Sequence, residues 1–227
     1  MTVALTVTQA VESRISCRRF LDTPVPGDTV REILAVARKA PSGGNLQPWF
    51  VYGLAGEPLA EFKAMIRDRL ATQPRGEGAE YDIYPRELHE PYRSRRFKCG
   101  EDLYATIGVV REDKPARLAQ FARNYEFFGA PVALFFCIDR RMGPPQWSDL
   151  GMYMQTVMLL ARERGLHTCA QEAWTHWHRA VGEFLALPAE QMLFSGMALG
   201  YMDERHPINT LRTDREPLEV FAQLRGL

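Results

Sequence analysis

The stretch from Ser148 to Arg164 limits the possible folds most, because its pattern is helical and apolar on nearly every side. Its apolar positions are Leu150, Met152, Tyr153, Met154, Val157, Met158, Leu159 and Leu160. A helix that is apolar all round is buried all round. In a chain of 227 residues we expect this helix at the centre of an interface between two subunits. Ser148 is the expected N-cap, and Gly165 the residue that ends the helix.

Helical and extended patterns alternate along the rest of the chain. The near-continuous apolar run 130–138 predicts a strand that is covered on both faces. Further strands are expected at 49–54, 167–171 and 192–201. Helices are expected at 8–16, 28–40, 57–71, 114–127, 177–186 and 218–224, with Asp28 as the N-cap of the second. These patterns predict one α+β domain over residues 1–227, with a four- or five-stranded sheet between helices.

Residues 73–113 change in character, since no strong period survives there and prolines, glycines and tyrosines accumulate. We expect a long excursion with broken helices, which includes the basic run 93–96. Segments of this length in a compact domain are usually lids or binding segments. A solvated surface insertion is the equally weighted alternative.

Charge and cysteine content exclude several classes of function. The 28 basic and 28 acidic side chains cancel, so no overall field attracts nucleic acid or an acidic membrane. Any bound anion must therefore be held by a local cluster. The four cysteines lie far apart without metal-ligand spacing, which favours buried reduced thiols and no metal site. No signal peptide or membrane span of about 20 apolar residues is recognisable, so a soluble cytoplasmic protein is expected.

Two clusters of arginine could supply such an anion site. Arg14, Ser16 and Arg18 place forked cationic donors and a hydroxyl within five residues, which suits a phosphate. Arg212 and Arg215 form a second basic point near the C-terminus. The alternatives are a solvated basic face for the first cluster and a charged tail for the second.

The segment 40–49, between a helix and a strand, has the composition of a ligand-binding loop. Pro41 and Pro48 stiffen its ends, and Gly43 allows the backbone to approach a flat ligand closely. Ser42 and Asn45 offer donors and acceptors to the edge of a heterocycle. An ordinary connection rich in glycine and proline is the alternative.

The ordered set of motifs resembles the FMN-dependent nitroreductase family from about residue 12 to residue 219. The motifs are Arg-x-Ser-x-Arg-x-Phe at 14–20, Pro-Ser-x-x-Asn-x-Gln-Pro-Trp at 41–49, and Arg215 followed by Pro-Leu. Segments 108–113, 124–131 and 149–155 are similar to the branch that includes nitrobenzoate and nitroaromatic-herbicide reductases. This resemblance implies a mostly antiparallel sheet and an intertwined homodimer with FMN at the interface.

Carried over position by position, the resemblance implies the cofactor contacts. The FMN phosphate and ribityl chain would be bound by Arg14, Ser16, Arg18, Arg212 and Arg215. The partner subunit would place Pro41, Ser42, Gly43 and Asn45 against the isoalloxazine. The backbone of Ala170, Gln171, Glu172 and Ala173 would donate to flavin N5. Many relatives carry Pro and Gly at the positions of Ala170 and Ala173, and a basic or polar residue at that of Ile15.

The resemblance also implies a ping-pong cycle, in which NADH or NADPH reduces FMN and an aromatic acceptor reoxidises it. The expected reaction is reduction of a nitroarene to the hydroxylamine, with no side-chain nucleophile and no metal. Tyr104, Phe128 and Trp147 are candidates for stacking on the acceptor, with core packing as the alternative. Three other functions stay open: a flavin, quinone or ene reductase or a dehydrogenase on the same scaffold, a non-catalytic FMN-binding module, and a structural protein.

Overall fold

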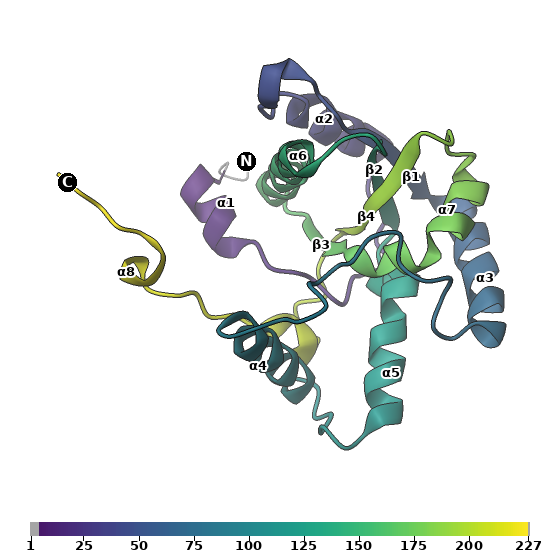
Figure 1. Ribbon diagram of the computed structural model, residues 1–227. Helices are drawn as coiled ribbons and strands as arrows, with labels where there is room; N and C mark the ends of the chain where they lie inside the picture. The colour runs from purple at the N-terminus through teal and green to yellow at the C-terminus, as the bar shows by residue number, and fades with distance from the viewer. Residues whose placement is uncertain (1–4, 227) are drawn as a thin grey trace.

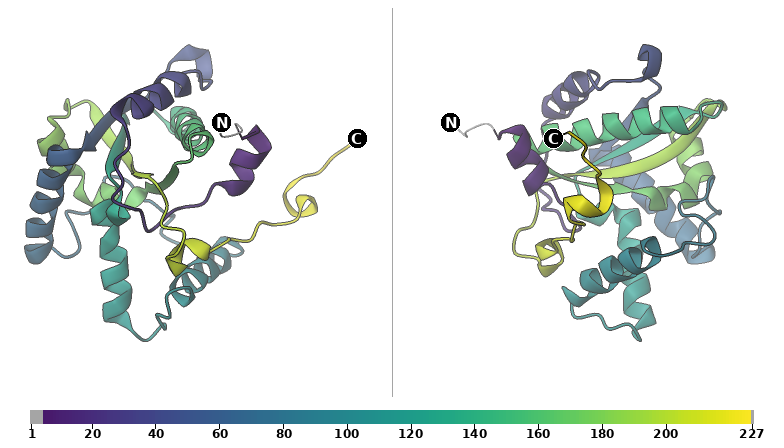
Figure 2. Two further views of the ribbon diagram at one scale, coloured as in Figure 1. Left: turned by 180° about the vertical axis from the view of Figure 1, so that it is seen from behind. Right: turned by 60° about the vertical axis from the view of Figure 1, so that its left-hand side comes forward.

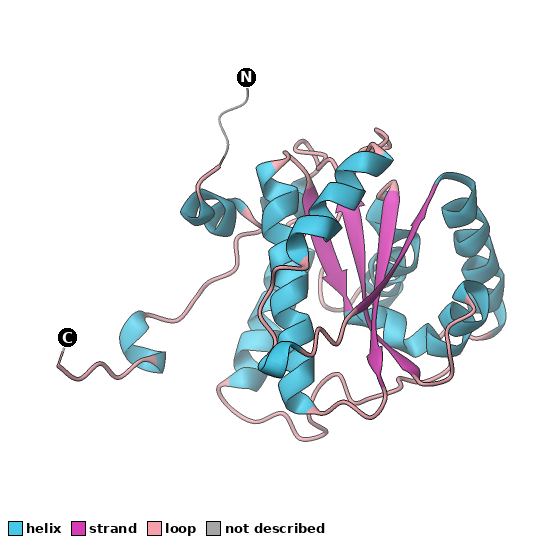
Figure 3. Cartoon of the chain, turned by 90° about the horizontal axis from the view of Figure 1, so that it is seen from above, coloured by secondary structure: helices cyan, strands magenta, loops and turns pink. Residues whose placement is uncertain are grey.

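An antiparallel sheet of four strands lies at the centre of this computed structural model, which describes residues 5–226. The strand order is β1-β2-β4-β3, and every neighbouring pair is antiparallel. The strands are β1 (Phe50–Ala55), β2 (Val132–Asp139), β3 (His167–Gln171) and β4 (Gln191–Gly200). This confirms the expected α+β class and a mostly antiparallel sheet of four to five strands. Figure 3 shows the sheet between its covering helices.

Strand β2 is central, and its alternate side chains enter two separate cores. Leu134 and Phe136 pack on one face, beneath helices α2 (Gly27–Ala37) and α6 (Pro144–Glu163). Phe135 packs on the other face, beneath α3 (Gly56–Thr72) and α7 (His178–Leu185). Because both faces are covered, β2 is buried from Val132 to Ile138, as its apolar run predicts.

Helix α6 is longer than its sequence pattern predicts, since it begins at Pro144. The prediction of Ser148 as its N-cap is therefore wrong, because the first helical position accepts proline and the helix starts one turn earlier. Gly165 ends the helix as expected, with a φ of 72°. The side chains that face the sheet are buried, whereas Met152 is 38% exposed. Within one subunit, α6 thus has an uncovered apolar side.

Several other boundaries differ from the predictions. Asp28 lies in the first turn of α2, and Pro26 is the N-cap. The helix expected over 114–127 is divided into α5 (Lys114–Ala122) and the 3-10 segment η2 (Arg123–Gly129). Residues 73–113 contain one regular helix, α4 (Tyr92–Ala105), instead of broken ones. The remaining helices are α1 (Val7–Ser13) and α8 (Leu218–Phe221), together with the short 3-10 segments η1 (Gly43–Asn45), η3 (Glu172–Trp177) and η4 (Pro207–Thr210).

A tightly packed aromatic cluster joins η2 to η3. Trp174 stacks on Phe127 with ring centroids 4.5 Å apart, and both side chains are fully buried. Phe127 and Phe128 have φ values of 49° and 55°, a left-handed conformation that bulky residues adopt only when the surroundings impose it. Gly196 of β4 leaves room for the indole, because a Cβ there would overlap Cδ1 of Trp174. The cluster therefore fixes both segments against the sheet.

Helices α1 and α8 lie at the periphery. Figures 1 and 2 show the C-terminal segment, drawn in yellow, running past α4 and away from the sheet and its helices. Its apolar side chains are exposed, with Phe221 at 70%. Within residues 5–226, no helix is both long enough and apolar enough to cross a bilayer.

Candidate active site

Arginines from both ends of the chain line one cavity of about 590 Å³, here called the arginine cavity. Arg14 and Arg18 enter it from the segment after α1, together with Ser16. Arg212 and Arg215 enter it from the segment after η4. The structure thus brings together all five residues that the sequence assigns to a phosphate.

Two buried polar contacts hold the two segments beside each other. The Arg18 backbone N–H donates to Oδ1 of Asn209 at 2.8 Å, and Nδ2 of Asn209 donates to the Arg19 carbonyl at 2.8 Å. The Cys17 N–H donates to the Thr168 carbonyl at 3.0 Å, which ties the first segment to β3. Sequence reasoning missed the role of Asn209, since nothing near it in the chain marks it as a clamp.

The arginine cavity carries an excess of positive charge, since its lining holds four arginines and one carboxylate, that of Glu12. Across residues 5–226, no carboxylate lies within ion-pair distance of Arg14, Arg18, Arg212 or Arg215. Nη1 of Arg212 donates to the Asn209 carbonyl at 2.9 Å, a contact that orients the side chain without neutralising it. Four guanidinium groups and a hydroxyl fit the charge and the geometry of a phosphate dianion. The residues present therefore fit the phosphate of FMN.

A neighbouring histidine experiences the same positive charge. His167, at the start of β3, is 7% exposed, and Nδ1 lies 3.3 Å from Nη1 of Arg162. Burial, followed by the charges of Arg162 and Arg212, lowers the pKa of His167 to about 4. The imidazole is therefore neutral at neutral pH and adds no further charge.

A second cavity, of about 680 Å³, adjoins the first, and Arg18 lines both. We call it the aromatic cavity, because its walls carry Tyr81, Tyr84, Tyr104, Phe121 and Phe128. Ala170, Gln171, Glu172 and Ala173, the segment expected to face flavin N5, form another part of its wall. The arrangement places a cationic cavity beside a space for planar rings.

The turn from β3 into η3 is held by one buried side chain. Gln171 is buried, and its Nε2 donates to the Asn124 carbonyl at 2.8 Å. Glu172, the next residue, is accessible to solvent but lies in the concave wall of the cavity. The surrounding protein desolvates its carboxyl group, and this raises the pKa of Glu172.

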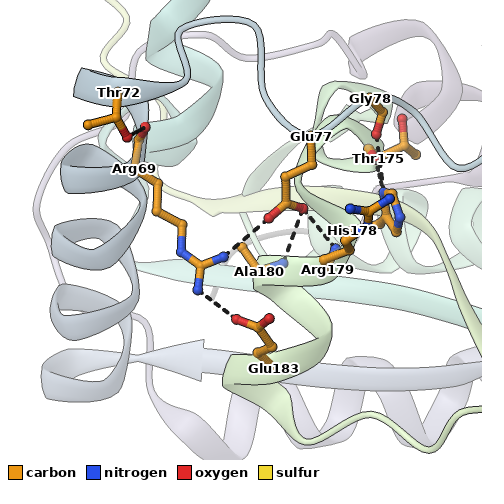
Figure 4. A network of polar contacts seen from close by, with 9 residues as sticks. All are labelled: Arg69, Thr72, Glu77, Gly78, Thr175, His178, Arg179, Ala180 and Glu183. Carbon is orange, nitrogen blue, oxygen red and sulfur yellow. Dashed lines mark hydrogen bonds and ion pairs between the residues drawn. The ribbon is translucent and has the colours of Figure 1, made fainter.

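A network around Glu77 anchors the segment 79–84, which lines the aromatic cavity (Figure 4). Oε2 of Glu77 accepts hydrogen bonds from the backbone N–H groups of Arg179 and Ala180, at 3.0 and 3.3 Å, in the first turn of α7. Oε1 accepts from Arg69 at 3.2 Å, and Arg69 also pairs with Glu183. A carboxylate at a helix N-terminus satisfies free N–H groups and interacts favourably with the helix dipole. Sequence reasoning did not identify Glu77.

The three aromatic candidates lie in different places. Tyr104 and Phe128 line the aromatic cavity, although the ring of Phe128 is almost fully buried. Trp147 lies outside the lining, with its ring centroid 5.5 Å from that of Tyr81. The ring of Tyr81, which does line the cavity, packs on Trp147, and the Tyr81 hydroxyl donates to the Phe194 carbonyl.

The predicted loop Pro41–Asn45 lines neither of these two cavities. It lies against α6, where the Gly43 N–H donates to Oδ2 of Asp149 at 3.2 Å. The Gln47 N–H donates to Oγ of Ser42 at 3.0 Å, which closes the loop on itself. A single subunit thus leaves the loop separate from the other predicted cofactor residues.

Comparison with known proteins identifies the family. The model of the nitroreductase family matches residues 11–201, most of the chain. This chain belongs to the nitroreductase family. The family assignment agrees with the resemblance carried by the arginine motif at 14–18 and the loop at 41–49.

Several characterised nitroreductases are similar over nearly the whole chain. The 4-nitrobenzoate reductase of Pseudomonas putida is 37% identical over 216 residues, which cover 95% of this chain and 94% of the relative. The nitrobenzene nitroreductase of Ectopseudomonas oleovorans is 36% identical over 212 residues, which cover 93% of this chain and 93% of the relative. The crystal structure of an FMN- and NADPH-dependent nitroreductase from Sphigopyxis sp. strain HMH superposes with a TM-score of 0.95 at 44% identity, over 98% of this chain and 100% of that one.

Proposed function

We propose that this nitroreductase is an FMN-dependent NAD(P)H oxidoreductase that reduces nitroarenes to hydroxylamines. The observation that supports this best is the junction of the two cavities at Arg18. One cavity carries four arginines without carboxylate partners, and the other is walled by aromatic rings. A flavin mononucleotide has a phosphate at one end and a planar ring system at the other, and so it matches both.

In this proposal the chain's own groups bind and orient the cofactor. Arg14, Ser16, Arg18, Arg212 and Arg215 hold the phosphate by charge-assisted hydrogen bonds. The backbone from Ala170 to Ala173 faces the reactive edge of the ring system. When bound, FMN supplies the two-electron transfer from NAD(P)H to the acceptor.

The overall reaction balances in two successive turnovers. In the first, ArNO2, NAD(P)H and a proton give ArNO, NAD(P)+ and water. In the second, ArNO, NAD(P)H and a proton give ArNHOH and NAD(P)+. The aromatic walls offer stacking surfaces for the acceptor, among them Tyr104, whereas the almost fully buried Phe128 backs the cavity from behind. A stacking role for Trp147 stays a prediction.

We also propose a homodimer in which each subunit lends its loop Pro41–Asn45 to the partner's flavin. The uncovered apolar side of α6 and the exposed apolar residues of the C-terminal segment support this proposal. So does the position of the loop, which lines neither cavity of its own subunit. Sedimentation equilibrium measures the mass directly, and a monomer that binds FMN with full affinity would contradict the shared site. A cytoplasmic location stays a prediction for cell fractionation.

The proposed reaction is tested by anaerobic stopped-flow spectroscopy of the purified protein. The expected result is a yellow protein whose flavin absorbance is bleached by NADH or NADPH and restored by 4-nitrobenzoate or nitrobenzene. Bleaching without reoxidation by any nitroarene would favour a flavin, quinone or ene reductase on the same scaffold. FMN binding without bleaching would favour a non-catalytic module, and a colourless protein that ignores FMN would contradict both.

A further inference from the structure

Arg96 is a cation in the wall of the aromatic cavity, away from the arginine cavity. It lies on α4, and its Cζ sits 4.2 Å from the ring centroid of Tyr84, which lines the same cavity. A guanidinium over an aromatic face is attracted by the ring quadrupole and keeps its N–H donors available. Tyr84 therefore positions Arg96 without neutralising it.

The neighbouring cations of α4 are neutralised by carboxylates. Arg93 pairs with Glu90 at 2.7 Å and Arg95 with Glu216 at 2.8 Å. Lys98 pairs with Asp102 at 2.6 Å and with Asp214 at 2.7 Å. In contrast to these three residues, Arg96 has neither an ion pair nor a hydrogen bond within the described part of the chain. The unpaired cation of this helix is thus the one that lines the cavity.

The charges around Arg96 favour a ligand with a single negative charge. Asp82 and Glu172 also line the aromatic cavity and would repel an anion there. Arg18 lines the cavity where it meets the arginine cavity, so Arg96 is the cation available to an anion in the rest of the aromatic cavity. A phosphate dianion would bind more favourably in the arginine cavity, which four guanidinium groups line. One guanidinium matches one carboxylate, which it binds through two parallel hydrogen bonds.

We propose that Arg96 is a specificity-determining residue that selects aromatic acceptors carrying a carboxylate. The acceptor ring lies among the aromatic walls, and its carboxylate pairs with the guanidinium held on Tyr84. This inference rests on the proposed nitroarene reduction and adds the class of acceptor. It predicts a preference for nitrobenzoates over uncharged nitroarenes of the same size.

The test compares 4-nitrobenzoate with nitrobenzene in the wild type and in Arg96→Gln. We expect kcat/KM for 4-nitrobenzoate to fall by about 10- to 100-fold, the range for loss of a charge-assisted hydrogen bond, and that for nitrobenzene to change less than about twofold. Arg96→Lys keeps the positive charge but loses the two parallel N–H donors of the guanidinium. Its kcat/KM for 4-nitrobenzoate should lie between those of the wild type and Arg96→Gln. Arg93→Gln removes the same charge from the same helix outside the cavity and should leave both values unchanged.

Other outcomes would overturn the assignment. An equal loss with both acceptors in Arg96→Gln, at unchanged flavin absorbance, would make Arg96 a structural residue. A change confined to reduction by NADPH, with reduction by NADH unaffected, would assign the guanidinium to the 2′-phosphate of the donor. No change with either acceptor would remove Arg96 from the binding site. Failure of the wild type to reduce any nitroarene would contradict the proposed function itself.

Discussion

The backbone N–H of Gly43 donates a hydrogen bond to Oδ2 of Asp149 across 3.2 Å. This contact fastens the loop Pro41–Asn45 to the second turn of α6, where the Asp149 side chain is almost fully buried. The helix whose free side is proposed to form the dimer interface thus also holds the loop proposed to reach the partner's flavin. In the proposed dimer, this hydrogen bond would couple the interface to the cofactor site.

Removal of the Asp149 carboxylate is therefore expected to weaken FMN binding, although Asp149 does not line the arginine cavity that would hold the phosphate. Asp149→Ala should lower the affinity by about 1.5–3 kcal/mol, the usual range for a hydrogen bond to a charged group. Asp149→Asn keeps an acceptor oxygen for the Gly43 N–H, and its FMN affinity should fall less than that of Asp149→Ala. Titration of the FMN-free protein with FMN, followed by flavin fluorescence, measures both. Wild-type affinity in the alanine variant would mean that the loop does not touch the flavin.

The arginine cavity is tested at Arg14. Arg14→Ala is expected to weaken FMN binding by about 1.5–3 kcal/mol, because a charge-assisted contact to the phosphate is lost. Arg67→Ala serves as the matched control, since Arg67 is an exposed arginine that pairs with Glu126 outside both cavities. Riboflavin, which lacks the phosphate, should bind the wild type and Arg14→Ala equally. An unchanged dissociation constant for FMN would remove Arg14 from the phosphate site.

The packing of Gly196 against Trp174 predicts a strong effect of one methyl group. Gly196→Ala should lower the free energy of unfolding by about 1–3 kcal/mol, because the indole has to move within a filled core. Gly100→Ala, on α4 with no neighbouring atom within 4 Å, should leave stability unchanged or raise it slightly. Urea unfolding measures both variants. Equal stability of Gly196→Ala and the wild type would show that the Trp174 ring is loosely packed.

The buried His167 predicts a loss of stability in mild acid. Its pKa of about 4 in the folded protein lies below the ordinary value of 6.5, so the unfolded chain binds the proton first. The contribution of His167 to the free energy of unfolding is constant above pH 6.5. It is lost as the pH falls towards 4, and the loss is at most about 3 kcal/mol.

His167→Asn should flatten the stability profile between pH 7 and pH 5. His206, whose pKa is also lowered by burial, contributes equally to both proteins and cancels in the comparison. Urea midpoints taken across this range provide the measurement. Parallel profiles for the wild type and the variant would contradict a buried neutral imidazole.

The anchor at Glu77 predicts an effect on the acceptor in addition to stability. Glu77→Gln weakens the cap on α7 and the pair with Arg69, and we expect a stability loss of about 1 kcal/mol. Because the anchored segment 79–84 lines the aromatic cavity, KM for the nitroarene should rise while FMN affinity stays constant. Glu183→Gln, at the exposed end of the same Arg69 fork, should leave KM unchanged. A rise in KM in both variants would assign the effect to Arg69.

Much of the fold was predictable, because its elements are defined by neighbours in the chain. The apolar run of β2 and the period of α6 each reflect burial of side chains a few positions apart. Their boundaries were less predictable: Ser148 has the chemistry of an N-cap, but the two prolines before it allow the helix to begin earlier. The left-handed backbone at Phe127, which takes it out of the helix expected over 114–127, accompanies tertiary packing of its ring on Trp174.

By itself, the sequence determined the main strands and helices, though not all of their boundaries, together with the family and the residue types that suit a phosphate and a planar ring. The tertiary structure alone decided that Asn209 clamps Arg18, that Glu77 anchors a cavity wall, and that Trp147 packs on Tyr81 outside the cavity lining. It also decided that Arg96 is left unpaired in that wall, whereas its neighbours on α4 are neutralised. The physical reason is that periodicity records local burial, whereas hydrogen bonds and ion pairs form between groups that only folding brings together.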